Sequence, residues 1–189
     1  MSSSAIIIGI IYILALTASV VPLAVGLEPK GESKPMRQVL VALVFAVTQA
    51  MMAFIGYLLG TAIDYLFGDL IRYLTFALML IVAFKMIVDS MKVLKGKRLY
   101  SFTSNWGYLL LGVLAGMNAF LMGLCSQGYL PFGKWYFLAL AAAGFLWAWS
   151  SVRKPYVPKM LRVMSFVEFS GAVFLAVVAV LYLFTDLTH

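Results

Sequence analysis

The sequence predicts an all-α integral membrane protein with six transmembrane helices, arranged as two inverted three-helix repeats. Composition is the first reason, since 64% of the 189 residues are hydrophobic and only 11% are charged, whereas soluble domains are about half apolar and about a quarter charged. Spacing is the second reason, because a membrane-spanning helix needs about 20 apolar residues and charges divide this chain at about that interval. We expect a single transmembrane domain, residues 1–189, with no room for a soluble one.

The first apolar run, about residues 5–27, could be mistaken for a signal peptide. No Lys or Arg precedes it, and it is too long for the apolar part of such a peptide, so we expect a retained first span. The other five runs are about 38–63, 70–91, 106–127, 132–152 and 163–185. The first repeat would therefore cover about 5–91 and the second about 106–185.

Basic residues indicate the orientation of these spans. The first, third and fifth loops hold Lys30, Lys34, Arg37, Lys92, Lys95, Lys97, Arg98, Arg153, Lys154, Lys159 and Arg162, whereas the termini and the other loops hold only Arg72 and Lys134. Because cytoplasmic loops are rich in Lys and Arg, we expect both termini on the non-cytoplasmic side of a bacterial inner membrane. Three spans per half reverse the orientation of the second half, an architecture typical of transporters.

Several functional classes have little support. The net charge of +7 would suggest nucleic acid in a soluble protein, but here the basic residues lie in loops, and no nucleic-acid partner is expected. The single cysteine, Cys125, excludes an internal disulfide and a C-x-x-C motif. His189, the only histidine, is the last residue and is expected in a solvated tail. We therefore expect no enzyme and no cofactor.

Two glycine pairs predict close helix packing. Gly56 and Gly60, and likewise Gly112 and Gly116, lie four residues apart, which puts each pair on one helix face. Packing within the chain is the favoured interpretation, and a homodimer interface is the other.

The first span contains a predicted break. Pro22 cannot donate the hydrogen bond that the Ala18 carbonyl would otherwise accept, and Thr17 and Ser19 flank that carbonyl. The freed carbonyl and two hydroxyls would suit a cation or an amide. A simple kink, satisfied by the hydroxyls themselves, explains the pattern equally well.

Amide side chains lie inside two other spans. Gln49 follows Thr48 near the middle of the second span, and Asn118 lies in the fourth. Because polar groups are costly in hydrocarbon, each marks either a pathway or an interhelical hydrogen bond.

Two ionisable residues lie within spans at equal depth. Lys85 precedes the cytoplasmic end of the third span and Glu168 follows the cytoplasmic start of the sixth, each roughly 8–9 Å from that face at 1.5 Å per residue. Their opposite charges predict a buried ion pair. Asp89 lies at a span end, as do Asp64, Asp69 and Asp186, and all four are expected to be solvated.

Several segments together resemble a known family. They are Pro35–Gln49, Ile55–Gly60, Lys85–Lys92, Asn118–Gly123 and Val167–Gly171. With the length and the six-span plan, they make the chain similar to the MntP-type manganese exporters of the LysE superfamily. The resemblance implies a bilayer partner and Mn²⁺ as a substrate, not as a resident cofactor.

The resemblance also identifies departures. The family has an aspartate where this chain has Ala18 or Ser19, a glutamate at Gln49 and an aspartate at Asn118, whereas Glu168 is retained. Hard divalent cations favour carboxylates, so the replacements should weaken a doubly charged site. Pro22 is similar to prolines of LysE-type amino-acid exporters.

The sequence thus predicts a small exporter that works by alternating access. Thr17, Ser19, Gln49 and Asn118 would line its site, with Glu168 as the remaining acid. One alternative is export of a small amino acid or another polar solute, and another is a non-transporting membrane partner protein. A membrane enzyme has least support, since no cluster of nucleophile, base or metal ligands occurs.

Overall fold

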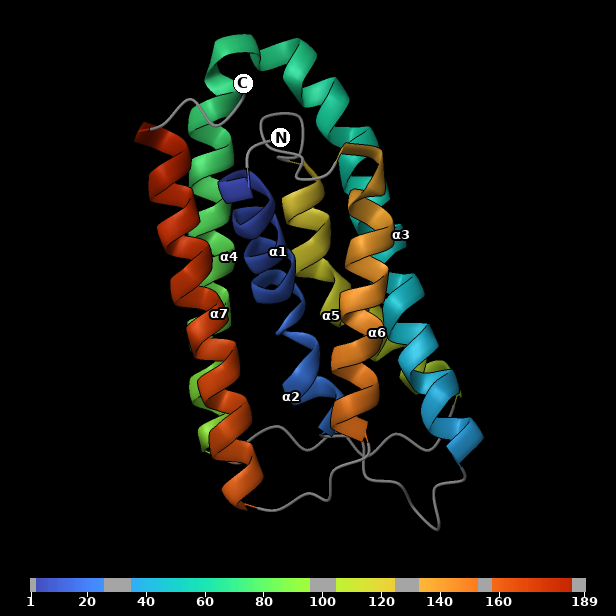
Figure 1. The fold of residues 1–189 in the computed structure, drawn as a ribbon. Coiled ribbons are helices and arrows are strands. Elements are labelled where there is room, and N and C mark those ends of the chain that lie inside the picture. Colours follow the sequence, from blue (N-terminus) through green and yellow to red (C-terminus); the bar gives the residue numbers. More distant parts are fainter. Residues whose placement is uncertain (1–2, 26–34, 96–104, 125–132, 153–157, 185–189) are drawn as a thin grey trace.

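The computed structural model describes residues 3–25, 35–95, 105–124, 133–152 and 158–184, and these form a helical bundle (Figure 1). The helices are α1 (Ser3–Thr17), α2 (Val20–Val25), α3 (Pro35–Phe67), α4 (Ile71–Leu94), α5 (Asn105–Leu124), α6 (Tyr136–Val152) and α7 (Pro158–Phe184). Short 3₁₀ turns, Gly68–Leu70 and Gly133–Trp135, precede α4 and α6. The predicted all-α class is confirmed for this part of the chain. Cys125 and His189 lie outside it.

The predicted break in the first span is present, and it divides that span into α1 and α2. Ala18 and Ser19 lie between the two helices. The Val21 N–H donates to the Ala18 carbonyl over 3.0 Å, replacing the donor that Pro22 lacks. The Ala18 carbonyl thus already accepts one backbone hydrogen bond, and its part in a cation or amide site remains a prediction.

Four of the six predicted spans are long and apolar enough to cross a membrane within the described residues. They are Gln38–Leu66, Ile71–Leu94, Trp106–Leu124 and Leu161–Phe184. The other two correspond to shorter apolar helices, Ile6–Thr17 and Tyr136–Val152. The break shortens the first, and the 3₁₀ turn, in which Gly133 has a φ of 54°, precedes the other. The six-span plan with inverted repeats remains a prediction.

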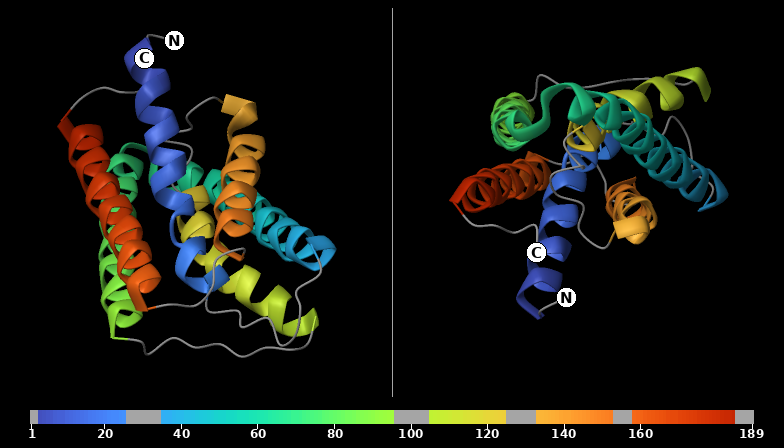
Figure 2. Two further views of the ribbon diagram at one scale, coloured as in Figure 1. Left: turned by 60° about the horizontal axis from the view of Figure 1, so that its bottom comes forward. Right: turned by 90° about the horizontal axis from the view of Figure 1, so that it is seen from above.

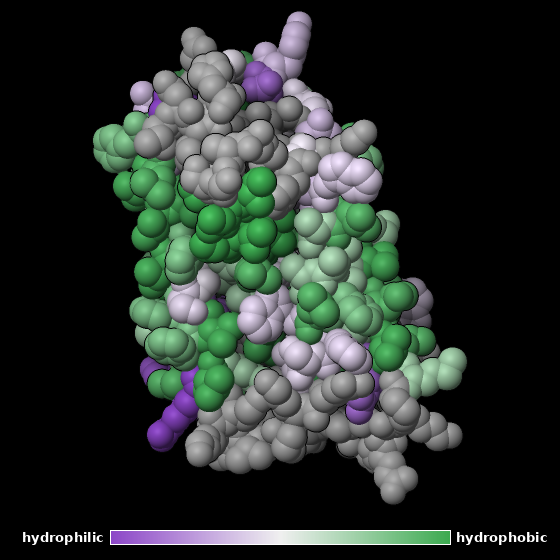
Figure 3. Space-filling model, viewed as in Figure 1, coloured by the Kyte–Doolittle hydropathy of each residue, from purple (hydrophilic) through white to green (hydrophobic). Residues whose placement is uncertain are grey.

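The outer surface of the bundle suits a bilayer. Large apolar side chains such as Leu43, Phe84 and Leu146 are exposed on its sides, and Figure 3 shows a hydrophobic band across the middle of the molecule. Trp106 at the start of α5 and Trp135 just before α6 are exposed. These two helices begin near opposite ends of the bundle (Figure 1). Exposed tryptophans at two levels are typical of membrane interfaces. The chain is therefore a multi-pass membrane protein.

Glycines bring α3 and α5 into backbone contact. A Cβ atom on Gly56 would collide with the carbonyl of Phe120, and one on Gly112 would lie 2.6 Å from Thr48 Oγ1. Gly60, Gly116 and Gly123 make similarly close approaches between the same two helices. Packing within the chain is thus the confirmed role of both glycine pairs, and they lend no support to a homodimer.

Helices α4 and α7 lie side by side (Figures 1 and 2). Ser90 Oγ donates to the Ser165 carbonyl over 3.0 Å, and Ser165 Oγ donates to the Ser90 carbonyl over 2.9 Å. Towards the other end, Arg72 Nη2 donates to the Leu183 carbonyl over 2.7 Å. The third and sixth predicted spans are therefore adjacent, as the proposed Lys85–Glu168 pair requires.

Candidate functional site

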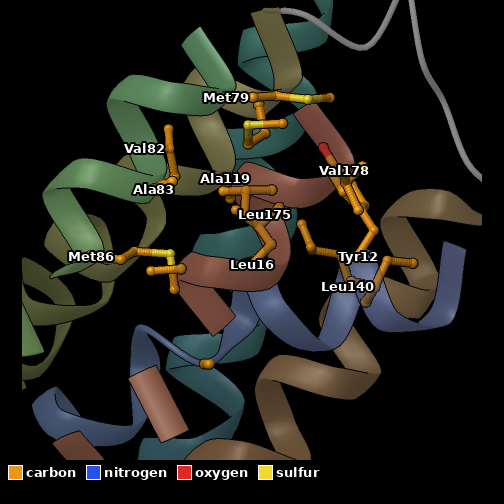
Figure 4. Packing of buried hydrophobic residues seen from close by; sticks show 14 of the residues in the cluster. Tyr12, Leu16, Met79, Val82, Ala83, Met86, Ala119, Leu140, Leu175 and Val178 are labelled. Carbon is orange, nitrogen blue, oxygen red and sulfur yellow. The ribbon is translucent and has the colours of Figure 1, made fainter. Parts of the chain in front are cut away.

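The apolar core is divided into two main clusters along the bundle. The first contains Tyr12, Leu16, Met79 and Leu175 (Figure 4). It lies towards the end of the bundle where α1 begins and α7 ends (Figure 1). The second cluster lies towards the other end and contains Val20, Leu23, Val41, Phe45, Leu111 and Ala148.

Most of the predicted site residues lie where the two clusters meet, whereas Thr17 lies between Leu16 and Ala18, which both belong to the first cluster. Ser19 falls between Ala18 of the first cluster and Val20 of the second, at the break between α1 and α2. Gln49 falls between Phe45 of the second cluster and Ala53 of the first.

Asn118 and Glu168 occupy the same level. Asn118 lies between Ala115 of the second cluster and Ala119 of the first. Glu168 lies between Met164 and Gly171 on α7. Met164 packs with Val21, and Gly171 lies close to Ala15 and Ala18. We call Thr17, Ser19, Gln49, Asn118 and Glu168 the polar layer; their exposed fractions lie between 0% and 5%.

The two hydroxyls of the polar layer bond to the backbone of α1. Thr17 Oγ1 donates to the Ile13 carbonyl over 2.8 Å, and Ser19 Oγ donates to the Leu16 carbonyl over 3.2 Å. These hydroxyls thus bond to carbonyls of the preceding turn, whereas the Ala18 carbonyl accepts from the Val21 N–H, so the kink is not of the kind in which the hydroxyls satisfy that carbonyl. Each hydroxyl oxygen keeps its lone pairs, so it can still accept a hydrogen bond.

Gln49 lies at the contact between α3 and α6. Its Oε1 atom is buried and has no hydrogen-bond partner among the described residues. A Cβ atom on Gly144 of α6 would collide with this oxygen. Gly144 therefore makes the space that the carboxamide occupies. One weak signal of this role is present in the sequence, namely a glycine at the end of an alanine run.

Asn118 forms an interhelical hydrogen bond, as one of its two interpretations predicted. Lys85 Nζ of α4 donates to Asn118 Oδ1 over 2.6 Å and lies 3.9 Å from Asp89 Oδ2. Lys85 therefore contacts both Asn118 and Asp89, and the Lys85–Glu168 pair remains a prediction.

Asp89 was missed as a site residue. It was expected in solvent at a span end, but its exposed fraction is 7%. Helix α4 continues to Leu94, about one turn past the predicted end, and thereby carries Asp89 into the bundle. Its carboxylate contacts Lys85 and also Lys92, whose Nζ lies 3.4 Å from Asp89 Oδ1.

A pocket of about 310 Å³ adjoins the polar layer between α2, α4 and α5. Its polar lining consists of Ser19, Lys85, Asp89 and Asn118, and we call it the polar pocket. A water molecule takes up about 30 Å³ in the liquid, so the volume would admit a small ion with part of its hydration shell. Thr17, Gln49 and Glu168 do not line it.

The part of the chain with described coordinates contains no group of three or more His, Cys, Asp or Glu residues able to hold a metal ion. The polar layer itself contains two hydroxyls, two amides and the carboxylate of Glu168, and Asp89 adds a second carboxylate in the neighbouring polar pocket.

Comparison with known proteins gave one match. The model of the Mntp family, described as a putative manganese efflux pump, matches residues 32–181. Neither the curated proteins nor the solved structures contain a significant match. The matched range includes every polar-layer residue except Thr17 and Ser19.

Proposed function

The chain belongs to the Mntp family, a family of membrane transporters and not of enzymes, and we propose that it exports a small cation such as Mn²⁺ by alternating access. The family supplies the substrate expectation and the direction of transport. The arrangement of this chain's own residues supports the mechanism.

The polar layer is the observation that carries this proposal. It crosses the bundle between two apolar clusters, and it coincides with the break between α1 and α2. Transporters built from inverted repeats bind substrate near the bilayer midplane, where broken helices expose polar backbone and side chains. The apolar cluster on either side would close access from that side of the membrane.

Helix pairing favours the inverted-repeat arrangement. The two halves would be α1–α4 and α5–α7, and α4 packs on α7 while α3 packs on α6. These contacts pair the third helix of each half and the second helix of each half, an arrangement that is compatible with a two-fold axis between the repeats. Both termini would then lie outside the cytoplasm, as the basic loops predict.

The charges of the site suggest weak binding of a divalent ion. Gln49 and Asn118 are neutral, and Lys85 brings a positive charge to Asn118. A dehydrated divalent ion in a low-dielectric site needs compensating negative charge, and Asp89 is already shared by Lys85 and Lys92. We therefore expect lower affinity for Mn²⁺ than carboxylates at Gln49 and Asn118 would give.

A second candidate function has one specific observation in its favour. The polar pocket offers both an ammonium group, on Lys85, and a carboxylate, on Asp89. This pair is complementary to the carboxylate and the ammonium of a small amino acid. Export of such a zwitterion would need no divalent-cation site. A purely structural membrane partner would not need the pocket at all.

Manganese content of a host that lacks its own efflux systems tests the proposal. We expect the wild-type protein to lower cellular manganese after a Mn²⁺ load. Asn118→Leu should abolish this effect, because it removes the amide oxygen that lines the polar pocket. The matched control is Thr61→Val, since Thr61 is exposed on α3 and donates to the Leu58 carbonyl of its own helix.

The result is interpreted at equal protein levels in the membrane. Full manganese clearance by Asn118→Leu would contradict a role for the polar layer. Absence of clearance by the wild type, with amino-acid efflux that Asn118→Leu abolishes, would favour the zwitterion.

A further inference from the structure

Lys85 is the feature that the proposed function does not yet explain. Its ammonium group lies in the polar pocket and donates to Asn118 Oδ1 over 2.6 Å. Asn118 itself is almost completely buried. The amide oxygen is thus occupied by a positive charge that belongs to the protein.

An ammonium group and a free cation compete for the same oxygen. Both are bound by amide and carboxylate oxygens, and a hydrogen bond with a charged donor is stronger than a neutral one. Lysine carries its charge as a compact group on a flexible stem. While this group remains at Asn118, its repulsion keeps a second cation from the polar pocket.

Asp89 offers the Lys85 ammonium group a second binding position. Its Oδ2 atom lies one helical turn along α4 and 3.9 Å from Lys85 Nζ. The Lys85 side chain is 41% exposed, so its surroundings leave space on one side of the stem. A small rotation would therefore release Asn118 and bring the ammonium group fully onto Asp89.

We propose that Lys85 is a tethered cation, which occupies Asn118 when the site is empty and moves to Asp89 when a free cation binds. This inference rests on the proposed cation transport but assigns a specificity-determining role to a residue outside the polar layer. A weakly bound cation could not displace Lys85 from Asn118. The lysine therefore sets the minimum affinity that a cation needs in order to bind in the polar pocket.

The tethered cation can be tested without manganese. Lys85→Ala should leave a space that a free alkylammonium ion fills, so methylammonium chloride should raise the melting temperature of this variant in detergent by several degrees. Sodium chloride at equal concentration controls for ionic strength. Lys92→Ala is the matched control, because Lys92 contacts the same carboxylate but does not line the polar pocket. An equal response of the two variants would overturn the inference.

Manganese binding separates this inference from the proposed function. Lys85→Met should bind Mn²⁺ at least about tenfold more tightly than the wild type, because one like charge leaves the site. Unchanged affinity would overturn the role of Lys85 as a competitor. Selective methylammonium stabilisation, with no Mn²⁺ binding by any variant, would support the tethered cation and refute manganese export.

The wild-type protein provides a measurement if Lys85→Ala does not fold. Saturating methylammonium should displace Lys85 from Asn118. An amine-reactive acylating reagent should then modify Lys85 faster relative to Lys92, as measured by mass spectrometry. An unchanged ratio would overturn the inference.

Discussion

Gly144→Ala is the substitution whose effect the structure defines most closely. The added methyl group would collide with Gln49 Oε1 across the contact between α3 and α6. Overpacking of this kind costs about 1–3 kcal/mol. Alanine stabilises a helix by about 1 kcal/mol relative to glycine. The net decrease in the free energy of unfolding should therefore be about 0–2 kcal/mol.

The effect of Gly144→Ala on the free energy of unfolding should change sign when the Gln49 carboxamide is removed. In a Gln49→Ala background the new methyl group meets no carboxamide, and the helix-propensity gain of about 1 kcal/mol remains. The coupling energy of this double-mutant cycle should therefore be about 1–3 kcal/mol.

Thermal unfolding of the four proteins in one detergent measures the cycle. Gly144→Ala should lower the melting temperature of the wild type and raise that of Gln49→Ala. Additive effects would refute the proposed contact, because they would mean that the two residues do not meet.

Three further predictions concern topology, charge and helix contact. A reporter that is active only in the cytoplasm should be silent when fused after His189, and full activity would contradict a model with both termini outside. Asn118→Asp combined with Gln49→Glu should lower cellular manganese further than the wild type at matched expression, since carboxylates suit Mn²⁺ better than amides; no difference would refute the charge argument. Cysteines at Lys85 and Glu168, in a chain without its native cysteine, should crosslink, because α4 and α7 are adjacent; failure would exclude direct pairing.

Sequence alone located the polar layer because its members are unusual in an apolar helix. Gln49 and Asn118 stand out in their spans, and Pro22 has a fixed consequence for the backbone four residues earlier. Such features depend on one helix only, so they can be recognised without knowing which helices meet.

Other features depend on a neighbour and could not be predicted in this way. The role of Gly144 follows from the carboxamide opposite it, and the partner of Asn118 follows from the packing that brings Lys85 to it. Asp89 was misjudged because its burial depends on the length of α4 and on the helices around it. The same limit applies to Ser90 and Ser165, whose hydrogen bonds join separate parts of the chain.

The glycine contact between α3 and α5 has a mechanical consequence. Where backbones touch directly, no long side chains lie between them to change rotamer and absorb relative sliding. Gly56 and Gly123 have this arrangement, with the carbonyls of Phe120 and Ala53 at the positions of the missing Cβ atoms. The two helices should therefore move as one rigid body during any conformational cycle. A spectroscopic label on the lipid-facing side of α3 would then also report the displacement of α5, and thus of Asn118.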